Sequence, residues 1–233
     1  MRVVLVHGFT QTARSWDPVV RQLPADVEPL AFEVPVGLDF VATAAALGQA
    51  GGRAAYVGYS MGGRLCLQLA LDRPDLVERL ILISASAGLD DPDARAARRV
   101  TDEQLAQEIE RDGVDAFLLR WLAQPLFASL TVEDADLDDR ARHTAADLAT
   151  TLRTLGAGVQ EPLWDRLAKL AMPVWIVAGN RDPKFMELGR RMYDLIPGAE
   201  LAVVQGAGHA AHLEHPEAIA SVIAEVVHGS VTS

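Results

Sequence analysis

Residues 58–62 read Gly-Tyr-Ser-Met-Gly and lie between a short apolar run and a helical pattern. The apolar run, 54–57, predicts a buried strand, and residues 63–71 predict a helix packed on a sheet. The chain must reverse sharply between these two elements, so we expect Ser60 on a strained turn with its hydroxyl exposed. The glycines beside it are needed because a Cβ atom there would collide with the neighbouring strand or helix. This segment therefore predicts a strand–turn–helix unit that presents a nucleophilic serine.

Strand and helix patterns alternate along most of the chain. Short β-branched and apolar runs predict five further strands, at residues 2–6, 29–34, 80–84, 173–178 and 201–204. Helices are expected from Asp17 to about Leu23, over 39–49, and from Pro216 onward. This alternation is typical of an α/β protein with a mostly parallel, doubly wound sheet. Because 233 residues, half of them apolar, can bury one sizeable core, we expect one α/β domain with an insertion.

The stretch 86–161 interrupts this rhythm because it contains no convincing strand. It carries three or four helical patterns, such as 102–111 and 135–155. A solvated connection is disfavoured, because the stretch is rich in apolar side chains that need something to cover, including Phe117, Leu118, Leu119, Trp121, Leu122, Leu126 and Phe127. We therefore expect a core made of 1–85 and 162–233, and a helical cap, 86–161, over the active site.

A serine hydroxyl needs a histidine base, and the histidine needs a carboxylate to orient it. Asp182 follows the strand at 173–178, and His209 follows the last strand, so both should lie at carboxyl ends of parallel strands. Asp182 could instead form a turn or cap before Pro183, and His209 could be an ordinary loop histidine. A metal site that joins His209 to the nearby histidines is disfavoured, because their spacing suits a helix start and no carboxylate or cysteine pattern supports it. We expect a Ser60–His209–Asp182 triad and no metal.

An oxyanion hole requires two backbone N–H donors. The amide of Met61 should supply one, because it follows the nucleophile directly at a helix N-terminus. The amide of Phe9, in the loop after the first strand, should supply the other. His7, in the same loop, is interpreted as a structural support rather than a base.

Charge and composition exclude several partners. The formal net charge of −11 argues against nucleic acid and against an anionic membrane surface. No apolar run approaches the ~20 residues needed to span a bilayer. The single cysteine, Cys66, and the absence of a signal-peptide pattern before the first strand predict a cytoplasmic protein. We expect a monomer or weak homo-oligomer, and an arginine cluster in the cleft of such an acidic chain would need an explanation.

The whole chain resembles the α/β-hydrolase superfamily and, within it, the 2-succinyl-6-hydroxy-2,4-cyclohexadiene-1-carboxylate (SHCHC) synthases of menaquinone biosynthesis. The resemblance is carried by residues 58–65, 84–89, 124–130, 182–185 and 208–214. The Gln-Pro-Leu-Phe-Ala-Ser and Asp-x-Lys-Phe pieces are more specific than the triad. The resemblance implies an α/β-hydrolase fold and a lyase that eliminates pyruvate from a polyanionic enolpyruvyl cyclohexene carboxylate. The triad would then abstract a proton, without a cofactor.

The resemblance also implies substrate-binding roles for Tyr59, Arg64, Arg98, Trp121 and Arg142. Arg64 lies one turn into an apolar helix, where the helix dipole disfavours a cation, so its guanidinium requires an anion. That anion could belong to the substrate or to a structural ion pair. For Arg98 and Arg142 the alternative is a solvated helix face.

One loop departs from the family pattern, and two other functions remain in competition. Residues 34–39 read Val-Pro-Val-Gly-Leu-Asp, where the family carries a Pro-Gly-His-Gly turn. A relative with another substrate is therefore an alternative, as is a serine esterase or thioesterase that acts through an acyl-enzyme. A non-catalytic receptor or scaffold is disfavoured, because it would not need Ser60, Asp182 and His209 together.

Overall fold

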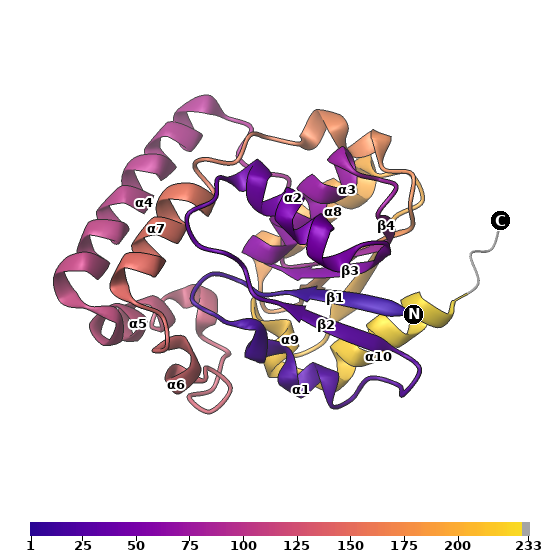
Figure 1. Cartoon of the computed structure of the whole chain (residues 1–233), viewed down its shortest axis with the longest axis horizontal. Coiled ribbons are helices and arrows are strands. Elements are labelled where there is room, and N and C mark those ends of the chain that lie inside the picture. The colour runs from indigo at the N-terminus through magenta and orange to yellow at the C-terminus, as the bar shows by residue number, and fades with distance from the viewer. Residues whose placement is uncertain (230–233) are drawn as a thin grey trace.

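The computed structural model describes residues 1–229, in which six parallel strands form one sheet in the order β2-β1-β3-β4-β5-β6 (Figure 1). The strands are β1 Arg2–Val6, β2 Glu28–Phe32, β3 Ala54–Tyr59, β4 Val77–Ile83, β5 Val174–Gly179 and β6 Glu200–Val204. The chain passes from β1 to β2 on one side and then returns to β3 on the other. The carboxyl ends of β1 and β3 therefore form a switch point, where open α/β sheets place their ligands. The predicted doubly wound sheet is confirmed, and every described strand pair is parallel.

Helices cover both faces of this sheet. The α-helices are α1 Asp17–Val20, α2 Phe40–Gly51, α3 Met61–Asp72, α4 Pro92–Asp112, α5 Val114–Leu122, α6 Leu137–Arg140, α7 Ala145–Leu155, α8 Pro183–Leu195, α9 Ala211–Glu214 and α10 Pro216–His228. Three 3-10 helices complete the set: η1 Ala13–Trp16, η2 Pro125–Phe127 and η3 Trp164–Lys169. Within residues 1–229, no helix is both long and apolar enough to cross a lipid bilayer.

The two faces of the sheet contribute to two separate cores because strand side chains alternate. Val4 and Val6 of β1 join a cluster with α2, α3 and α8, whereas Val3 and Leu5 join a cluster with α1, α9 and α10. Figure 1 shows these two helix groups above and below the sheet. The sheet is therefore buried on both faces, and a ligand can approach it at the carboxyl ends of the strands.

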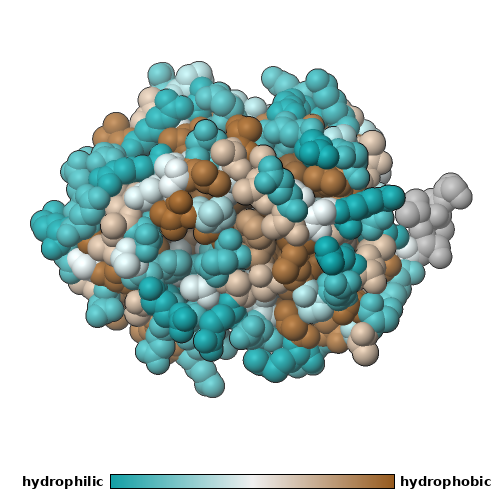
Figure 2. All heavy atoms as spheres, viewed as in Figure 1, coloured by the Kyte–Doolittle hydropathy of each residue, from teal (hydrophilic) through white to brown (hydrophobic). Residues whose placement is uncertain are grey.

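Helices α4 to α7 form an insert between β4 and β5, at the left of Figure 1. The insert has a small core of its own, made of Ala106, Ile109, Phe117, Leu118, Leu148, Ala149 and Leu152. Leu119 was expected to need cover, but 64 % of it is exposed. Figure 2 shows mostly hydrophilic residues along the outer edge of the insert. The apolar side chains of the insert pack mainly on one another, and Phe9 from the loop after β1 packs against them.

The single helix expected over 135–155 is wrong, because two helices occupy that stretch. Helix α6 ends at Arg140, and α7 starts afresh after Thr144. The Thr144 side chain accepts a hydrogen bond from the Asp147 amide, and the Asp147 carboxylate accepts one from the Thr144 amide. This capping box satisfies two amides at the start of α7, which makes a separate helix favourable there. The helix expected from Asp17 is also shorter, and ends at Val20.

The passage from β3 into α3 is packed so closely against β1 that position 62 has no room for a side chain. A Cβ atom on Gly62 would overlap the backbone carbonyl groups of Val6 and His7. Backbone atoms cannot rotate aside as a flexible side chain can. The glycine is therefore required for β1, β3 and α3 to meet at the switch point.

We expect Gly62→Ala to lower the free energy of unfolding by about 3 kcal/mol or more, because overpacking against backbone cannot relax. Gly189→Ala on α8 is the matched control, since its Cβ would meet only the side chains of Ile176 and Leu201, at 3.2 and 3.7 Å. Alanine is also the better helix former, so this control should be neutral or stabilising. Urea unfolding of both variants checks the prediction, and equal midpoints would contradict it.

Candidate active site

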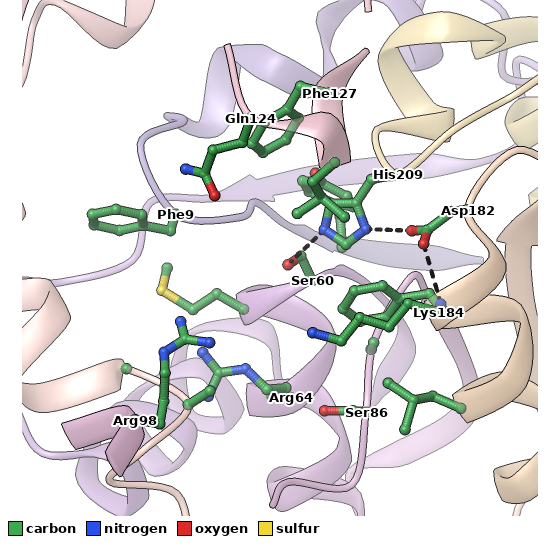
Figure 3. Close-up of a pocket in the computed structure, with 18 of the residues that line it drawn as sticks. Phe9, Ser60, Arg64, Ser86, Arg98, Gln124, Phe127, Asp182, Lys184 and His209 are labelled. Atoms are coloured by element: carbon green, nitrogen blue, oxygen red, sulfur yellow. Dashed lines mark hydrogen bonds and ion pairs between the residues drawn. The ribbon is translucent and has the colours of Figure 1, made fainter. Parts of the chain in front are cut away.

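Three side chains from the carboxyl ends of separate strands meet at the switch point. Ser60 follows β3, Asp182 follows the turn after β5, and His209 follows β6. His209 Nε2 lies 3.2 Å from Ser60 Oγ, and His209 Nδ1 lies 2.8 Å from Asp182 Oδ2 (Figure 3). An N–H on Nδ1 donates to the carboxylate and leaves Nε2 free to accept the serine proton. The residues expected to form a triad therefore lie in the arrangement that activates a serine.

Ser60 adopts the strained backbone that the sequence predicts. Its φ of 50° and ψ of −106° lie outside the regions that L-residues prefer. The Ser60 amide donates to the Ile83 carbonyl at 2.9 Å, which ties the turn to β4. This backbone conformation places the Ser60 hydroxyl at the carboxyl end of β3.

Asp182 acts in two ways at once. Its Oδ1 accepts a hydrogen bond from the Phe185 amide at 3.2 Å and caps helix α8, while Oδ2 binds His209. The cap interpretation and the triad interpretation therefore both describe this residue. Helix α8 fixes the carboxylate, and the carboxylate fixes the imidazole.

Sequence reasoning missed Glu214, which braces the loop that carries His209. Its two carboxylate oxygens accept hydrogen bonds from the amides of Gly208, at 2.8 Å, and Ala210, at 3.1 Å. The clamp therefore holds the residue on each side of the histidine. An acid five residues after a candidate histidine was the available signal, but spacing alone does not show a side chain turning back onto the backbone.

The two amides expected to form an oxyanion hole border the same cavity as Ser60. Among residues 1–229, neither the Phe9 amide nor the Met61 amide donates to a backbone or side-chain acceptor. The Met61 amide is free because it lies at the first position of α3. His7 supports the Phe9 loop: its Nδ1 donates to the Gly8 carbonyl at 2.9 Å, and its Nε2 accepts from the Val34 amide at 3.1 Å. Both ring nitrogens of His7 are thus occupied by backbone.

A cavity of about 690 Å³ lies beside Ser60, between the sheet and the insert. Apolar and aromatic side chains form much of its wall, including Phe9, Tyr59, Trp121, Phe127 and Phe185. Among the described lining residues there are five cationic side chains, Arg64, Arg98, Arg140, Arg181 and Lys184. One carboxylate, that of Asp182, lines it, and it is engaged by His209. The cavity is therefore a cationic space inside an acidic protein.

Arg64 is buried and has neutral partners. It donates to Gln160 Oε1 at 3.1 Å and to the Leu155 carbonyl at 2.7 Å. Burial, with repulsion by Arg98, lowers the pKa of Arg64 to about 10. In the described part of the chain, no carboxylate lies at ion-pair distance from it. The structural ion pair that the sequence left open is absent from this part, and the charge faces the cavity.

Arg98 reaches the cavity from the insert. Its Nε donates to Asp102 Oδ1 at 2.7 Å, which orients the guanidinium. Figure 3 shows the guanidinium groups of Arg98 and Arg64 side by side, with Lys184 pointing into the same space from the α8 side. Three helices, α3, α4 and α8, thus bring cations to one place.

The structure does not bring Arg142 to the cavity. Its side chain is 62 % exposed and lies 4.0 Å from Asp139. Arg140 lines the cavity instead; its side chain is buried and donates to the Ala135 carbonyl and to Thr10 Oγ1. The expectation for Arg142 is corrected: residues two positions apart in a helical turn point to different sides, and Arg140 faces the cavity while Arg142 faces solvent.

Tyr59 and Trp121 both border the cavity. The ring of Tyr59 lies 5.3 Å from His209 and is buried, which raises the pKa of its hydroxyl strongly. Trp121, on α5, stacks edge to face on Phe9 at 5.3 Å. Both rings therefore form part of the cavity wall, and each is fixed by contact with another aromatic ring.

His212 lies behind the triad, buried between Trp16 and Tyr59 at ring distances of 4.9 and 4.1 Å. Burial lowers the pKa of His212 well below its usual value, so its ring is neutral. Among residues 1–229, no group of three or more histidine, cysteine, aspartate or glutamate side chains is arranged to hold a metal ion.

Comparison with known proteins is consistent with this geometry. The sequence matches the alpha/beta hydrolase family over residues 3–222. A Bacillus subtilis (strain 168) protein, provisionally named as a 2-succinyl-6-hydroxy-2,4-cyclohexadiene-1-carboxylate synthase, is 30 % identical over 96 % of this chain and 89 % of its own. A synthase of that name from Salmonella paratyphi B is 28 % identical over 97 % of this chain and 93 % of its own. The structure of MenH from S. aureus superposes with a TM-score of 0.90 at 26 % identity, covering 97 % of this chain and 93 % of that one. The chain belongs to the alpha/beta hydrolase family and, within it, resembles the SHCHC synthases.

Proposed function

We propose that this chain is a lyase that eliminates pyruvate from an enolpyruvyl cyclohexene carboxylate, the SHCHC synthase reaction of menaquinone biosynthesis. The observation that carries the proposal is the cationic cavity: five cations beside the serine, in a chain of net charge −11. An acidic protein repels a polyanion unless the cleft is locally positive. The names of the relatives point to the same substrate class. The single buried cysteine, Cys66, is in keeping with a reducing cytoplasm.

In this reaction Ser60 acts as a base rather than as a nucleophile. His209 takes the hydroxyl proton, and the Ser60 alkoxide removes a proton from a ring carbon of the substrate. The electron pair of that C–H bond forms the new ring double bond. The C–O bond to the enolpyruvyl group breaks, and its electron pair leaves with pyruvate enolate, which is then protonated. Asp182 holds the imidazole and stabilises its charged form.

The cations and amides divide the negative charge of the substrate between them. Arg64 and Arg98 bind carboxylates, for which guanidinium groups are suited because they can donate two parallel hydrogen bonds. The amides of Phe9 and Met61 stabilise the charge that develops during proton removal. Trp121 and Tyr59 form walls for the ring. Arg140 takes the place in the cavity that the sequence had indicated for Arg142.

We expect Ser60→Ala, Asp182→Asn and His209→Ala each to remove most pyruvate release while the fold survives. The three residues act as a unit, so the loss in a double variant should be much smaller than the product of the single losses. Coupled lactate dehydrogenase assays measure pyruvate, and circular dichroism checks the fold. Full activity of Ser60→Ala would remove the mechanism.

We also expect no covalent intermediate during turnover, because a base catalyst leaves the serine unmodified. Intact-protein mass spectrometry after rapid acid quench should show the unmodified mass. An accumulating acyl-enzyme with this substrate would instead support an esterase or thioesterase acting through the same Ser60, His209 and Asp182.

Loss of the Arg64 charge should affect the polyanion selectively. Arg64→Met should lower kcat/KM for the enolpyruvyl substrate by about a hundredfold, as expected for a charged hydrogen bond of roughly 2–3 kcal/mol. Any hydrolysis of a small neutral ester should be spared. Arg191→Met is the control, because Arg191 pairs with Asp90 outside the cavity. Equal losses on both substrates would mean that Arg64 is structural.

A further inference from the structure

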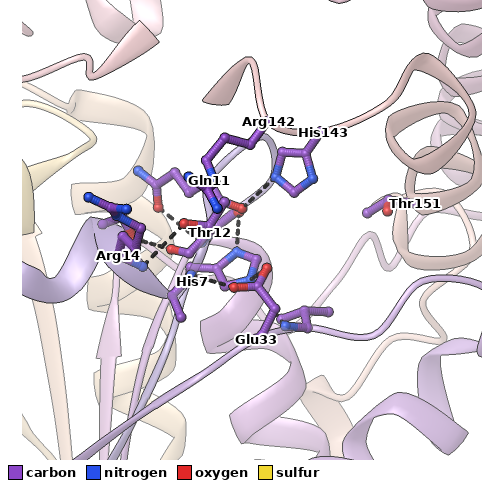
Figure 4. A network of polar contacts seen from close by, with 12 residues as sticks. His7, Gln11, Thr12, Arg14, Glu33, Arg142, His143 and Thr151 are labelled. Carbon is purple, nitrogen blue, oxygen red and sulfur yellow. Dashed lines mark hydrogen bonds and ion pairs between the residues drawn. The ribbon is translucent and has the colours of Figure 1, made fainter. Parts of the chain in front are cut away.

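The loop after β1, residues 8–12 and here called the oxyanion loop, is tied to the insert by three polar contacts. Thr12 Oγ1 donates to Asp139 Oδ2 at 2.6 Å. Arg140 donates to Thr10 Oγ1, and His143 Nε2 donates to the Gln11 carbonyl at 2.9 Å. Figure 4 shows part of this network, with His143 and Arg142 approaching Gln11 and Thr12 from the insert. Three consecutive loop residues are thus bound by a five-residue stretch, 139–143, some 130 positions away in the sequence.

The oxyanion loop is strained next to its proposed oxyanion donor. Thr10, which directly follows Phe9, has a φ of 68°. A β-branched residue avoids this left-handed region, so the conformation persists only where its surroundings enforce it. The one side-chain contact described for Thr10 is the hydrogen bond from Arg140 of the insert. The hydrogen bond that fixes the buried Thr10 hydroxyl therefore comes from the insert.

Phe9 itself is also held by the insert. Its ring packs on Trp121 at 5.3 Å and on Phe117 at 6.2 Å, both on α5. The insert thus packs on the Phe9 ring through α5 and hydrogen-bonds the following three residues through 139–143. The Gly8–Phe9 peptide is held from the core side by His7, whose Nδ1 donates to the Gly8 carbonyl at 2.9 Å, so the direction of the Phe9 N–H depends on His7 and on the insert together.

Two of the three insert residues that make these polar contacts, Asp139 and Arg140, are charged and buried. Asp139 is 7 % exposed and Arg140 is 2 % exposed. Asp139 also faces the guanidinium groups of Arg14, at 3.7 Å, and Arg142, at 4.0 Å. Buried charges are costly unless they are paired and hydrogen-bonded. Asp139 and Arg140 each have one partner within the insert, Arg142 and the Ala135 carbonyl, and their remaining contacts, to Thr12, Arg14 and Thr10, are made only while the insert is seated on the loop.

We infer that Asp139 and Arg140 are positioning residues that aim the Phe9 amide at the reacting centre through the oxyanion loop. The inference rests on the proposed function in taking Phe9 as an oxyanion donor. Seating of the insert then has two results: it closes the cavity, and it completes the oxyanion hole. Displacement of 139–143 would release Thr10 from its strained conformation and turn the Phe9 amide away while Ser60, His209 and Asp182 stay in place.

The test uses a reaction that needs the serine and the oxyanion hole but not the lyase substrate. An alkyl fluorophosphonate forms a Ser60 Oγ–P bond as its P–F bond breaks; fluoride leaves, the hydroxyl proton passes to His209, and the phosphoryl oxygen occupies the oxyanion hole. Asp139→Ala should slow this labelling about tenfold or more, as partial loss of one oxyanion donor implies. Thr12→Val should slow it similarly, whereas Thr12→Ser, which keeps the hydroxyl, should restore the rate.

Neither Asp139 nor Thr12 lines the cavity, so pyruvate-release kinetics should show a lower kcat with KM changed less than about twofold. The double variant should lose no more than either single one, since both remove the same bond. The matched control is Thr131→Val, which breaks a Thr131–Asp134 hydrogen bond of the same 2.6 Å length on the exposed side of the insert. It should label at the wild-type rate.

The outcomes separate this inference from the proposed function. Labelling slowed as expected in a chain that releases no pyruvate would sustain the positioning role and remove the lyase proposal. Pyruvate release with unchanged labelling in folded Asp139→Ala and Thr12→Val would remove the positioning role alone. Wild-type protein that is not labelled at Ser60 also overturns the inference, because its oxyanion hole would then not be assembled. If Asp139→Ala unfolds, Thr12→Val against Thr12→Ser decides.

Discussion

The close approach of β1 to the first turn of α3 is the constraint on which the site depends. Gly62 allows the backbone of α3 to touch the carbonyl groups at the end of β1, so the loop after β1 and the turn after β3 leave the sheet side by side. The strained Ser60 and the Phe9 loop are consequences of that contact. Asp182 and His209 can then reach Ser60 from the next strands, because all six strands run in the same direction.

The distribution of charge gives the site its chemical character. The chain as a whole is acidic, yet the cavity collects cations from the core and from the insert. Burying Arg64 without a carboxylate partner is unfavourable for folding, as the lowered pKa of its guanidinium reflects. Neutral oxygen atoms of Gln160 and Leu155 offset part of that cost without cancelling the charge. Such an arrangement suits an enzyme whose substrate brings the missing anions.

The sequence was sufficient for the sheet and for the residues expected in the triad, because each depends on local patterns. Apolar runs predict strands, and a glycine-flanked serine between a strand and a helix predicts its own turn. The insert was harder to predict. Its helices pack on one another and on loops distant in the sequence, so whether Arg140 or Arg142 reaches the cavity depends on how this segment is seated on the loop after β1. The break before Thr144 was overlooked, although Thr144 and Asp147 have the spacing of a capping box. Glu214 was missed because it binds backbone amides, and its spacing from His209 does not show that its side chain turns back onto them.

The contacts between the insert and the oxyanion loop bear on how such a protein can change. The insert does more than cover the cavity beside Ser60. Residues 139–143 and the aromatic rings of α5 contact the loop beside Ser60, so the insert also supports the residues around the triad. An insert transplanted from a relative would bring its own substrate-binding residues, but it would not match the loop after β1 of this chain. A substitution in the insert that changes the substrate range can therefore also change the catalytic rate. Divergence toward a new substrate then requires matching changes in the insert and in the loop after β1.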